Sequence, residues 1–563
     1  MTEPTDLTKK ITTWREQEVD RANKLVLGDL LEGVLAGRRE ALSLAQEMFC
    51  CRLSFGTAGL RGPLRPGPNG MNRIVVSQTT AGLATYLLTK RGRAFEETIH
   101  VVVGFDGRHQ SDVFGEDTAE IFSGHGIRAT RLPWPVPTPV LAFAVRELNA
   151  EAGVMVTASH NPATDNGYKV YLGGEDCGSQ IVPPVDQQIE NFIGEVVERL
   201  SFSKIPRSRI LVHNATSELI GGYIQATLSV LPVSVPGPKA ISVVYTAMHG
   251  VGGNTFLAAM DAAGFPKPTV VEQQFEPDPD FPTVAFPNPE ETGALDLSFV
   301  KGRSVGADLI IAHDPDADRL AVALPDSSTT DGYRALTGNQ VGAIFGWHIA
   351  GNTSSSGKTG TLANSLVSSP VLGKIAKHFG LSHEETLTGF KYVSRVKNLI
   401  FGFEEALGYL VTPDVVRDKD GISAGLLMVS LANSLAQEGR TLWDYLRTIE
   451  ECVGAFASGQ VTIRLGAGVP GPTVTATLRE KDLEAIGPRA VTRRDDFLDG
   501  VGDFPADDIL RYYLDDGTRV IARPSGTEPK VKIYIDTEGS TSAQAEAILT
   551  EVEADINELV NSL

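Results

Sequence analysis

The amino-acid sequence predicts an α/β protein built from several domains. The chain has 563 residues, and a typical domain size of about 150 residues suggests about four domains. Strand and helix patterns alternate from residue 99 onward, which indicates βαβ units and a mainly parallel sheet. The alternation restarts near residues 241–245 and 359–367, so we expect three related α/β units. The end of the chain has a different pattern and is expected to form an α+β domain.

The spacing of apolar residues predicts the individual elements. Residues 7–50 are expected to be helical, because Leu27, Leu30 and Leu31 recur at helical spacing and Gly37 is a plausible stop. The next expected elements are strands at 99–105, 128–132, 152–156 and 308–312, and a helix at 117–124.

Proline-rich stretches and a turn divide the rest of the chain. Residues 230–238 are expected to be a joint, and residues 275–289, with five prolines, an ordered loop. Residues 512–522 are expected to form two strands around the turn Asp515-Asp516-Gly517. A strand at 531–535 and an amphipathic helix at 542–563 complete the expected C-terminal domain.

Composition limits the function classes. The net charge of −20 argues against general binding of nucleic acid or anionic membranes, which need a basic surface. The four cysteines lack metal-type spacing and suit a reducing compartment. No signal peptide is recognised, and no apolar run approaches the ~20 residues of a membrane span. We therefore expect a cytoplasmic protein that must gather cations locally to bind an anionic substrate.

The hexapeptide at 157–162, Thr-Ala-Ser-His-Asn-Pro, contains a candidate nucleophile. Ser159 follows the buried-strand pattern at 152–156, so it is expected where that strand ends. A serine hydroxyl is a weak nucleophile unless a base, a metal or a cation activates it. His160 is an adjacent candidate base. The hexapeptide alone is compatible with several serine chemistries, including acyl transfer.

Residues 314–319 predict a metal site. Asp314, Asp316 and Asp318 alternate along a segment that is expected to be extended, which would point all three carboxylates to one side. Crowded carboxylates repel each other unless a cation lies among them, and Mg²⁺ is the natural occupant. The alternative is a solvated acidic turn or a helix cap. Arg319 directly after the aspartates favours the metal site.

Residues 523–530, Arg-Pro-Ser-Gly-Thr-Glu-Pro-Lys, predict a phosphate-binding loop. Gly526 permits a backbone in which successive N–H groups surround an anion. Two hydroxyls and two cations suit a phosphate, and the alternative is an ordinary hairpin loop. The expected phosphate ligands are Arg523, Ser525, Gly526, Thr527 and Lys530.

Two further loops carry weaker signals. Residues 402–409 place Glu404 and Glu405 in a glycine-bounded loop, where carboxylates can accept hydrogen bonds from sugar hydroxyls. The alternative is that these glutamates only face water. Residues 55–62 form a glycine-rich stretch with Arg61, which is expected near a phosphate.

Together these motifs resemble the α-D-phosphohexomutase superfamily, the phosphoglucomutases and phosphomannomutases. The serine loop, metal loop, sugar loop and phosphate loop occur in the order of that family, and the resemblance covers nearly the whole chain. Residues 388–391, Thr-Gly-Phe-Lys, and 418–421, Asp-Lys-Asp-Gly, are similar to the long-chain branch. That branch includes phosphopentomutase-type phosphoglucomutases and glucose-1,6-bisphosphate synthases.

The resemblance implies four domains around a central cleft, the first three of them alike. The expected domains are 1–207 with the serine loop, 208–326 with the metal loop, 327–452 with the sugar loop and 453–563 with the phosphate loop. It also implies small-molecule sugar phosphates as partners and a monomer or homodimer.

The resemblance further implies that Ser159 is a phosphoserine and that Mg²⁺ joins its phosphate to the three aspartates. A hexose 1-phosphate and a hexose 6-phosphate would interconvert through a sugar 1,6-bisphosphate. Arg319 would neutralise the moving phosphoryl group, and Lys169 or His160 would accept the sugar proton. A neutral Lys169 would need a depressed pKa. Lys391 and Arg395 are expected to face the sugar or its phosphate.

One position departs from the family pattern. Many phosphoglucomutases have serine where this chain has Ala406, and the change removes a hydrogen bond worth ~0.5–1.5 kcal/mol. A looser hold on the hexose leaves a second hypothesis open: a glucose-1,6-bisphosphate synthase that recharges Ser159 from a donor such as fructose 1,6-bisphosphate. A sugar-phosphate sensor without catalysis is a third, although a sensor needs no nucleophile.

Overall fold

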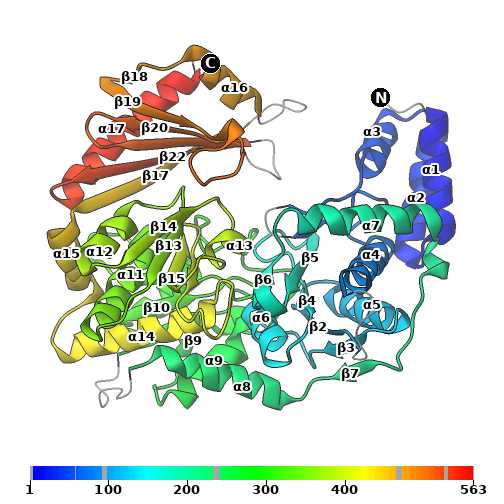
Figure 1. Ribbon diagram of the computed structural model, residues 1–563, viewed down its shortest axis with the longest axis horizontal. Coiled ribbons are helices and arrows are strands. Elements are labelled where there is room, and N and C mark those ends of the chain that lie inside the picture. Colours follow the sequence, from blue (N-terminus) through cyan, green and yellow to red (C-terminus); the bar gives the residue numbers. More distant parts are fainter. Residues whose placement is uncertain are drawn as a thin grey trace. The chain divides into compact units, whose positions relative to one another are not determined.

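The computed structural model describes residues 4–56, 59–91, 98–232, 241–464, 472–524 and 530–561. The chain divides into two compact units, one of Met1–Ala335 with Thr412–Ser434 and one of Leu336–Val411 with Leu435–Leu563. Each unit contains sheets with helices packed against them (Figure 1). Of the helices that these residues form, none is both long enough and apolar enough to cross a membrane.

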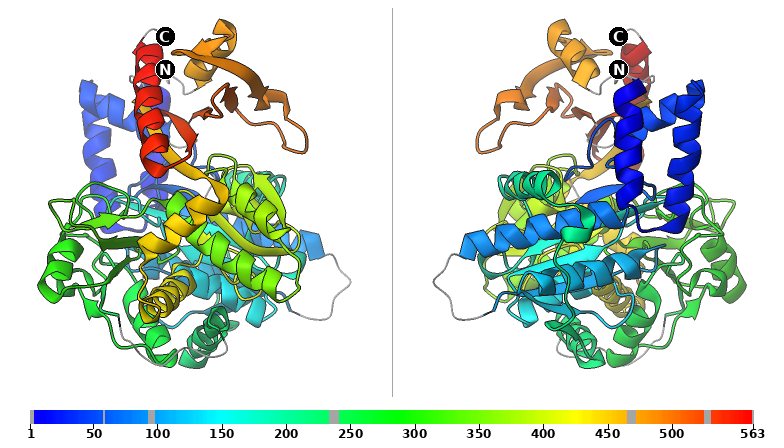
Figure 2. Two further views of the ribbon diagram at one scale, coloured as in Figure 1. Left: turned by 90° about the vertical axis from the view of Figure 1, so that its left-hand side faces the viewer. Right: turned by 90° about the vertical axis from the view of Figure 1, so that its right-hand side faces the viewer.

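The chain begins with a group of helices, as the apolar spacing of residues 7–50 predicts. These are α1 (Pro4–Gln17), α2 (Arg21–Leu35) and α3 (Arg39–Phe49), which lie beside one another in both views of Figure 2. Leu7, Leu27 and Met48 belong to a small buried core of their own. The side chain of Asp20 caps α2 by accepting a hydrogen bond from the amide of Asn23.

The first sheet is mixed, with helices on both faces. Its order is β1-β5-β4-β2-β3-β7, and β6 pairs with β5. The helices α4, α5 and α7 group on one face and α6 lies on the other (Figure 1). The strands are β1 (Leu60–Pro63), β2 (His100–Phe105), β3 (Arg128–Arg131), β4 (Ala152–Val156), β5 (Asp165–Leu172), β6 (Ser179–Gln180) and β7 (Val212–Asn214), and the helices are α4 (Arg73–Arg91), α5 (Ser111–Gly124), α6 (Thr138–Glu147) and α7 (Val185–Arg199).

The second sheet completes the first unit. Its order is β12-β11-β10-β8-β9. The strands are β8 (Val243–Thr246), β9 (Thr269–Val270), β10 (Leu309–Ala312), β11 (Ala321–Pro325) and β12 (Tyr333–Ala335), and the helices are α8 (Ser217–Thr227), α9 (Gly252–Ala262) and α10 (Asp296–Val305). The edge strands β7 and β12 lie beyond the domain boundaries expected at residues 207 and 326.

The third sheet belongs to the second unit. Its order is β14-β13-β15-β16. The strands are β13 (Thr361–Ser365), β14 (Ser382–Thr386), β15 (Leu399–Glu404) and β16 (Gly408–Leu410), and the helices are α11 (Gly338–Ser355), α12 (Val371–Phe379), α13 (Phe390–Val393) and α15 (Leu442–Val453). The helix α14 (Gly421–Gln437) follows β16 in the chain, but most of it belongs to the first unit. A capping box at Thr337 and Gln340 starts α11.

The fourth sheet is antiparallel and confirms the α+β character expected of the C-terminal region. Its order is β17-β22-β21-β20-β19-β18, and α17 packs along β17 and β22 (Figure 2). Tyr512 pairs with Val520 across the predicted turn. The strands are β17 (Ala455–Arg464), β18 (Ala485–Ile486), β19 (Arg489–Asp496), β20 (Leu510–Leu514), β21 (Arg519–Pro524) and β22 (Lys530–Gly539), and the helices are α16 (Pro472–Lys481) and α17 (Ser542–Asn561). Short 3₁₀ helices lie at Gly174–Asp176, Phe202–Lys204, Leu228–Val230, Glu272–Gln274 and Phe497–Asp499.

All four sequence motifs occupy the same kind of position. Each lies between two strands that pair antiparallel: β4 and β5, β10 and β11, β15 and β16, and β21 and β22. In the first three sheets the earlier strand of each pair also has a parallel neighbour. The expectation of a mainly parallel sheet holds for the third sheet, whereas the first two sheets are mixed, because antiparallel strands are added beside their parallel strands. Three sheets share this hairpin arrangement, as expected of related units.

The segment 412–434 contacts the metal loop within the first unit. The amide of Gly421 donates to Ala317 O at 3.2 Å, and Gly421 O accepts a hydrogen bond from His313 Nε2 at 2.9 Å. A Cβ at Gly421 would overlap Arg319 O and lie 2.8 Å from Ala317 O. Glycine is therefore required where α14 begins.

We expect Gly421→Ala to destabilise the protein by about 1–3 kcal/mol, because the added methyl meets backbone atoms that cannot move aside. Gly194→Ala is the matched control: a Cβ there meets nothing within 4 Å in the exposed face of α7. Loss of glycine flexibility should stabilise this control by up to about 1 kcal/mol. Urea unfolding of both variants measures the difference, and equal stabilities would contradict the close approach.

Candidate active site

Ser159 lies in the buried first part of the hairpin loop that follows β4. Ser159 is 2% exposed and has a left-handed φ of 53°. Its amide donates to Thr157 Oγ1 at 2.9 Å. Its hydroxyl donates to Asp314 Oδ2 at 2.9 Å and lies 3.2 Å from His160 Nδ1. The predicted nucleophile, one predicted base and one predicted metal ligand therefore meet, although Ser159 and Asp314 come from different sheets.

The three aspartates of the metal loop converge, but not for the expected reason. The loop after β10 is a turn, in which the Ala317 amide donates to Asp314 O at 2.9 Å and Ala317 has a φ of 52°. The prediction of an extended segment is wrong, because this turn and not strand alternation gathers the carboxylates. Asp314, Asp316 and Asp318 are each at most 1% exposed, and their ligand atoms lie within 4.8 Å of one another.

This cluster fits a hard divalent cation. Among the described residues, no group donates a hydrogen bond to Asp316 Oδ1 or Asp318 Oδ1, although both atoms are buried. Burial raises the pKa of the Asp314 carboxyl well above its usual range, and the charges of Asp316 and Asp318 raise it further. A cation with oxygen ligands would satisfy the bare oxygens and relieve this repulsion.

Lys169 on β5 reaches the same aspartates. Its Nζ lies 2.7 Å from Asp316 Oδ2 and 2.9 Å from Asp318 Oδ2, in a side chain that is 1% exposed. Burial works to lower the pKa of Lys169, but the two carboxylates outweigh it and raise that pKa. Lys169 is thus held as an ammonium, and the depressed pKa that a lysine base requires is absent.

The pKa of His160 is shifted in the opposite direction to that of Lys169. Burial lowers the pKa of this imidazole well below its usual value, and the charges of Arg319 and Arg61 lower it further. At neutral pH His160 is therefore uncharged and able to accept a proton. Of the two predicted bases, it is the one with the suitable protonation state.

Two predicted arginines also lie in this region. The Arg319 amide donates to Asp314 Oδ1 at 3.0 Å, and its guanidinium lies 3.5 Å from Glu290. Arg61 lies on β1, paired with Gly167, and its pKa is lowered by burial while the charges of the aspartate cluster act to raise it. Cations and carboxylates are thus interleaved around Ser159.

The predicted sugar-binding residues lie in the second unit: Glu404 is the last residue of β15, Glu405 follows it, and Lys391 is on α13. Glu404 Oε1 accepts a hydrogen bond from the Gly389 amide at 2.7 Å. Glu405 accepts hydrogen bonds from Ser368 Oγ at 2.9 Å and from Ser365 Oγ. Glu405 therefore fastens the loop to its own domain. Lys391 is 8% exposed.

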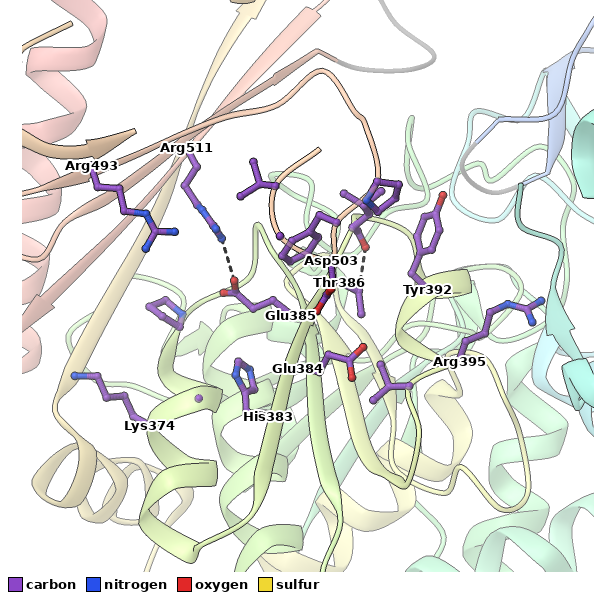
Figure 3. A pocket seen from close by; sticks show the side chains of 18 residues that line it. Lys374, His383, Glu384, Glu385, Thr386, Tyr392, Arg395, Arg493, Asp503 and Arg511 are labelled. Carbon is purple, nitrogen blue, oxygen red and sulfur yellow. Dashed lines mark hydrogen bonds and ion pairs between the residues drawn. The ribbon is translucent and has the colours of Figure 1, made fainter. Parts of the chain in front are cut away.

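The predicted phosphate loop is described only at its ends. Arg523 lies one residue before the end of β21 and Lys530 is the first residue of β22, whereas Ser525, Gly526 and Thr527 lie outside the described residues. Arg395 lines a cavity of about 980 Å³ in the second unit, between β14 and the 501–505 loop (Figure 3). Arg511 on the opposite wall is paired with Glu385 at 2.9 Å, so that cation is already compensated.

Comparison with known proteins identifies the fold. Sequence models of the phosphoglucomutase/phosphomannomutase family match domain I at residues 52–199, domain II at 222–327, domain III at 337–452 and the C-terminal domain at 478–554. The chain belongs to this family. It has the four-domain phosphohexomutase architecture, and α1–α3 precede the matched region.

Relatives of this phosphohexomutase-family chain are sugar phosphomutases. A Haemophilus influenzae protein named "Probable phosphomannomutase" is 46% identical over 493 residues, which cover 87% of this chain and 98% of the relative. Human phosphopentomutase is 33% identical over an alignment of 590 residues, which covers 96% of this chain and 93% of the relative. The open form of Paramecium pp63/parafusin, a phosphoglucomutase, has a similar fold, with a TM-score of 0.69, 19% identity and coverage of 91% of this chain and 96% of that chain.

Sequence reasoning on this family member missed several residues of the site. Thr138, at the start of α6, donates to Asp316 Oδ2 at 2.6 Å, and Lys419 Nζ lies 3.2 Å from Asp318 Oδ2. Nothing in the local sequence marks Thr138. Lys419 belongs to the Asp-Lys-Asp-Gly stretch that carries the family resemblance, and its position between two aspartates was the available signal.

Replacing Lys169 tests the charge balance of the site. We expect Lys169→Met to lower the free energy of unfolding by about 3–5 kcal/mol in a chelator, because Asp316 and Asp318 lose their closest cation. Saturating Mg²⁺ should recover part of that loss. Urea unfolding with EDTA and with Mg²⁺ measures it.

Lys374→Met is the control, since Lys374 forms an exposed pair with Glu538 at 3.1 Å and its loss should cost less than about 1 kcal/mol in both buffers. An equal loss for Lys169→Met with and without Mg²⁺ would show that the aspartates do not bind the ion.

Proposed function

We propose that this chain is a sugar-phosphate mutase that carries a phosphoryl group on Ser159 and interconverts hexose 1-phosphate and hexose 6-phosphate. The observation that carries the proposal is the 2.9 Å contact between the buried Ser159 hydroxyl and Asp314 within the aspartate cluster. A nucleophile beside a divalent-cation site is suited to phosphoryl transfer, in which positioning and charge neutralisation dominate. Membership of the family and its named relatives support the same conclusion.

The proposed cycle has two transfers. In the first, the bond between phosphorus and Ser159 Oγ breaks as a bond to the free sugar hydroxyl forms, which gives a sugar 1,6-bisphosphate. The bisphosphate turns over within the site. In the second, its other phosphoryl group moves to Ser159 Oγ and the isomeric monophosphate leaves. Arg319 and Arg61 would stabilise the negative charge that spreads over the phosphoryl oxygens during each transfer.

Proton movement is assigned to His160. The sugar hydroxyl must lose a proton when it attacks, and the serine oxygen must gain one when it leaves. His160 is held neutral by its low pKa, and its Nδ1 is 3.2 Å from Ser159 Oγ, so it can accept the first proton and return it to serine. Lys169 would remain charged and orient Asp316 and Asp318.

Asp314, Asp316 and Asp318 would hold Mg²⁺, which when bound supplies Lewis-acid neutralisation of the phosphoryl oxygens. Their positions are supported from behind by Thr138, Lys169 and the Arg319 amide.

An assay with both possible donors separates mutase from synthase. The purified protein is incubated with Mg²⁺ and glucose 1-phosphate, with and without fructose 1,6-bisphosphate, and glucose 6-phosphate and glucose 1,6-bisphosphate are both followed. We expect catalytic isomerisation with only trace bisphosphate. Stoichiometric bisphosphate that requires the second donor would instead identify a synthase. Mannose 1-phosphate and ribose 1-phosphate are run in parallel, because the named relatives include a phosphomannomutase and a phosphopentomutase.

Ser159→Ala should lower turnover by about 10⁴-fold or more, because no other group can carry the phosphoryl. The matched control is Thr164→Ala, which removes an exposed hydroxyl from the same loop and should retain activity. A labelled phosphoryl group from the substrate should appear on the peptide containing Ser159 in the wild type and in the control. Turnover that survives in Ser159→Ala would refute the assignment of the nucleophile.

A further inference from the structure

Arg108 is buried beneath the serine loop, although no sequence motif pointed to it. It follows β2, and its side chain is essentially inaccessible to solvent. Its own amide donates to Asp106 Oδ1 at 3.0 Å, and its Nε lies 3.5 Å from Asp106 Oδ2. The guanidinium therefore projects from a rigid turn at the end of a central strand.

That guanidinium donates hydrogen bonds to three backbone carbonyls of the serine loop and to the carbonyl of Asp165, the first residue of β5. Nη2 donates to Ser159 O at 2.6 Å and to Asn161 O at 2.5 Å. Nη1 donates to Pro162 O at 2.7 Å and to Asp165 O at 3.1 Å. Carbonyl oxygens that point at one another repel, so this loop conformation requires a cation at its centre. The planar, permanently charged fork of arginine suits four acceptors, whereas the compact ammonium of lysine has only three donors.

A loop of the second sheet's domain covers the same guanidinium. The ring of Phe281 lies 4.9 Å from Arg108 Cζ and is 3% exposed. Phe281 belongs to the proline-rich stretch 275–289. A second contact joins the same segments, because His109 Nε2 lies 2.7 Å from Asp280 Oδ1. Arg108 thus links the loop that bears Ser159 to the domain that bears the aspartates.

The backbone of Ser159 explains why such a link is needed. A φ of 53° is unfavourable for a residue with a side chain, and it persists only where surrounding contacts determine it. The Arg108 bond to Ser159 O is one such contact. The Ser159 amide bond to Thr157 Oγ1 is another, on the other side of the same residue.

We propose that Arg108 is a positioning residue that holds Ser159 in its left-handed conformation and so directs Oγ at Asp314. The catalytic part of this inference rests on the proposed phosphomutase function. The structural part, control of the serine loop, does not.

Arg108→Gln and Arg207→Gln form a matched pair for the test. Arg207 lies in the same domain, bonds Asp117 Oδ1 at 2.5 Å and Ser77 Oγ at 2.7 Å, and stacks 5.0 Å from Phe202, but no described contact joins it to the serine loop. We expect Arg108→Gln to lower kcat by about 100-fold with a KM changed less than about threefold, since a misplaced reacting group slows transfer more than binding. Arg207→Gln should affect stability alone. Added guanidinium should partly restore kcat in Arg108→Ala and not in Arg207→Ala.

Hydrogen exchange gives a readout that needs no turnover. The amides of residues 159–161 and 163–165 should exchange faster in Arg108→Gln than in Arg207→Gln. Unchanged exchange, or a kcat equal to that of the control, would overturn the proposal.

If Arg108→Gln does not fold, a second variant, Phe281→Leu, removes the stacked ring and should raise exchange in the same segment to a smaller degree. No rise in exchange would overturn the proposal equally. If the wild type turns over no sugar phosphate, the proposed function fails while the exchange experiment still decides the role of Arg108.

A separate observation concerns Cys50 and Cys51, directly after α3. Their Sγ atoms are 3.1 Å apart and both residues are exposed. Burial and the hydrogen bond with Cys50 raise the pKa of Cys51 to about 11. Cys177 and Cys452 are also exposed, but each is isolated in the sequence.

We infer that Cys50 and Cys51 are a dithiol modification site for disulfide oxidants. One thiol attacks an oxidant disulfide, which releases one thiol and leaves a mixed disulfide; the second cysteine then attacks that sulfur and releases the other thiol. Two protein thiols are oxidised and one oxidant disulfide is reduced to two thiols. Neighbouring Cα atoms are only about 3.8 Å apart across a trans peptide, below the usual disulfide span of about 4.4–6.8 Å. The ring would be strained and easily reduced.

Peptide mass spectrometry after treatment with oxidised glutathione tests this site. The Cys50–Cys51 peptide should lose two hydrogens and regain them with a mild monothiol, whereas Cys177 and Cys452 should gain only glutathione adducts. Cys50→Ser and Cys51→Ser should each replace the two-hydrogen loss by an adduct on the remaining cysteine. Stable adducts on both cysteines of the wild type, or no reaction there, would overturn the inference.

Discussion

Mutual repulsion among three buried carboxylates is the constraint on which the first unit depends. Asp314, Asp316 and Asp318 are almost completely removed from water, where like charges at this spacing are strongly unfavourable unless cations lie beside them. Lys169 and Lys419 supply that charge from β5 and from the segment after β16. The cluster is stable because folding brings cations from separate parts of the chain beside it. The charge balance of the site therefore depends on the tertiary fold.

A repeated hairpin explains how one architecture supplies several kinds of functional loop. In each of the first three sheets a buried strand with a parallel neighbour runs into a short loop and returns antiparallel. Two paired strands fix both ends of that loop, so its side chains are held by the sheet. The chemistry then depends on the residues at the loop: a nucleophile after β4, carboxylates after β10, and glutamates at the end of β15. Glu405 also stabilises the loop in which it lies, because it accepts a hydrogen bond from Ser368.

Local patterns predicted much of this arrangement, and the failures have physical causes. The helices of residues 7–50 were predictable because burial of one face repeats at helical spacing, the strand at 152–156 because it is a continuous apolar run, and the C-terminal hairpin because of its turn residues. The prediction that the aspartate segment is extended was wrong, because Ala317 adopts a left-handed φ in a turn. Alanine rarely adopts this conformation, so the sequence does not indicate the turn. The protonation of Lys169 could not be predicted from its own segment, because carboxylates about 150 residues away raise the pKa of this lysine.

The sequence by itself determined the order of the elements, the four motif loops and the family, because each rests on short-range spacing or on residue identity. Tertiary structure decided which groups meet. The contact of Ser159 with Asp314, the neutrality of His160 and the four carbonyls around Arg108 all join segments from separate strands. Electrostatic and hydrogen-bonding energies depend on distance and burial in space, and neither quantity is written in the local pattern of residues.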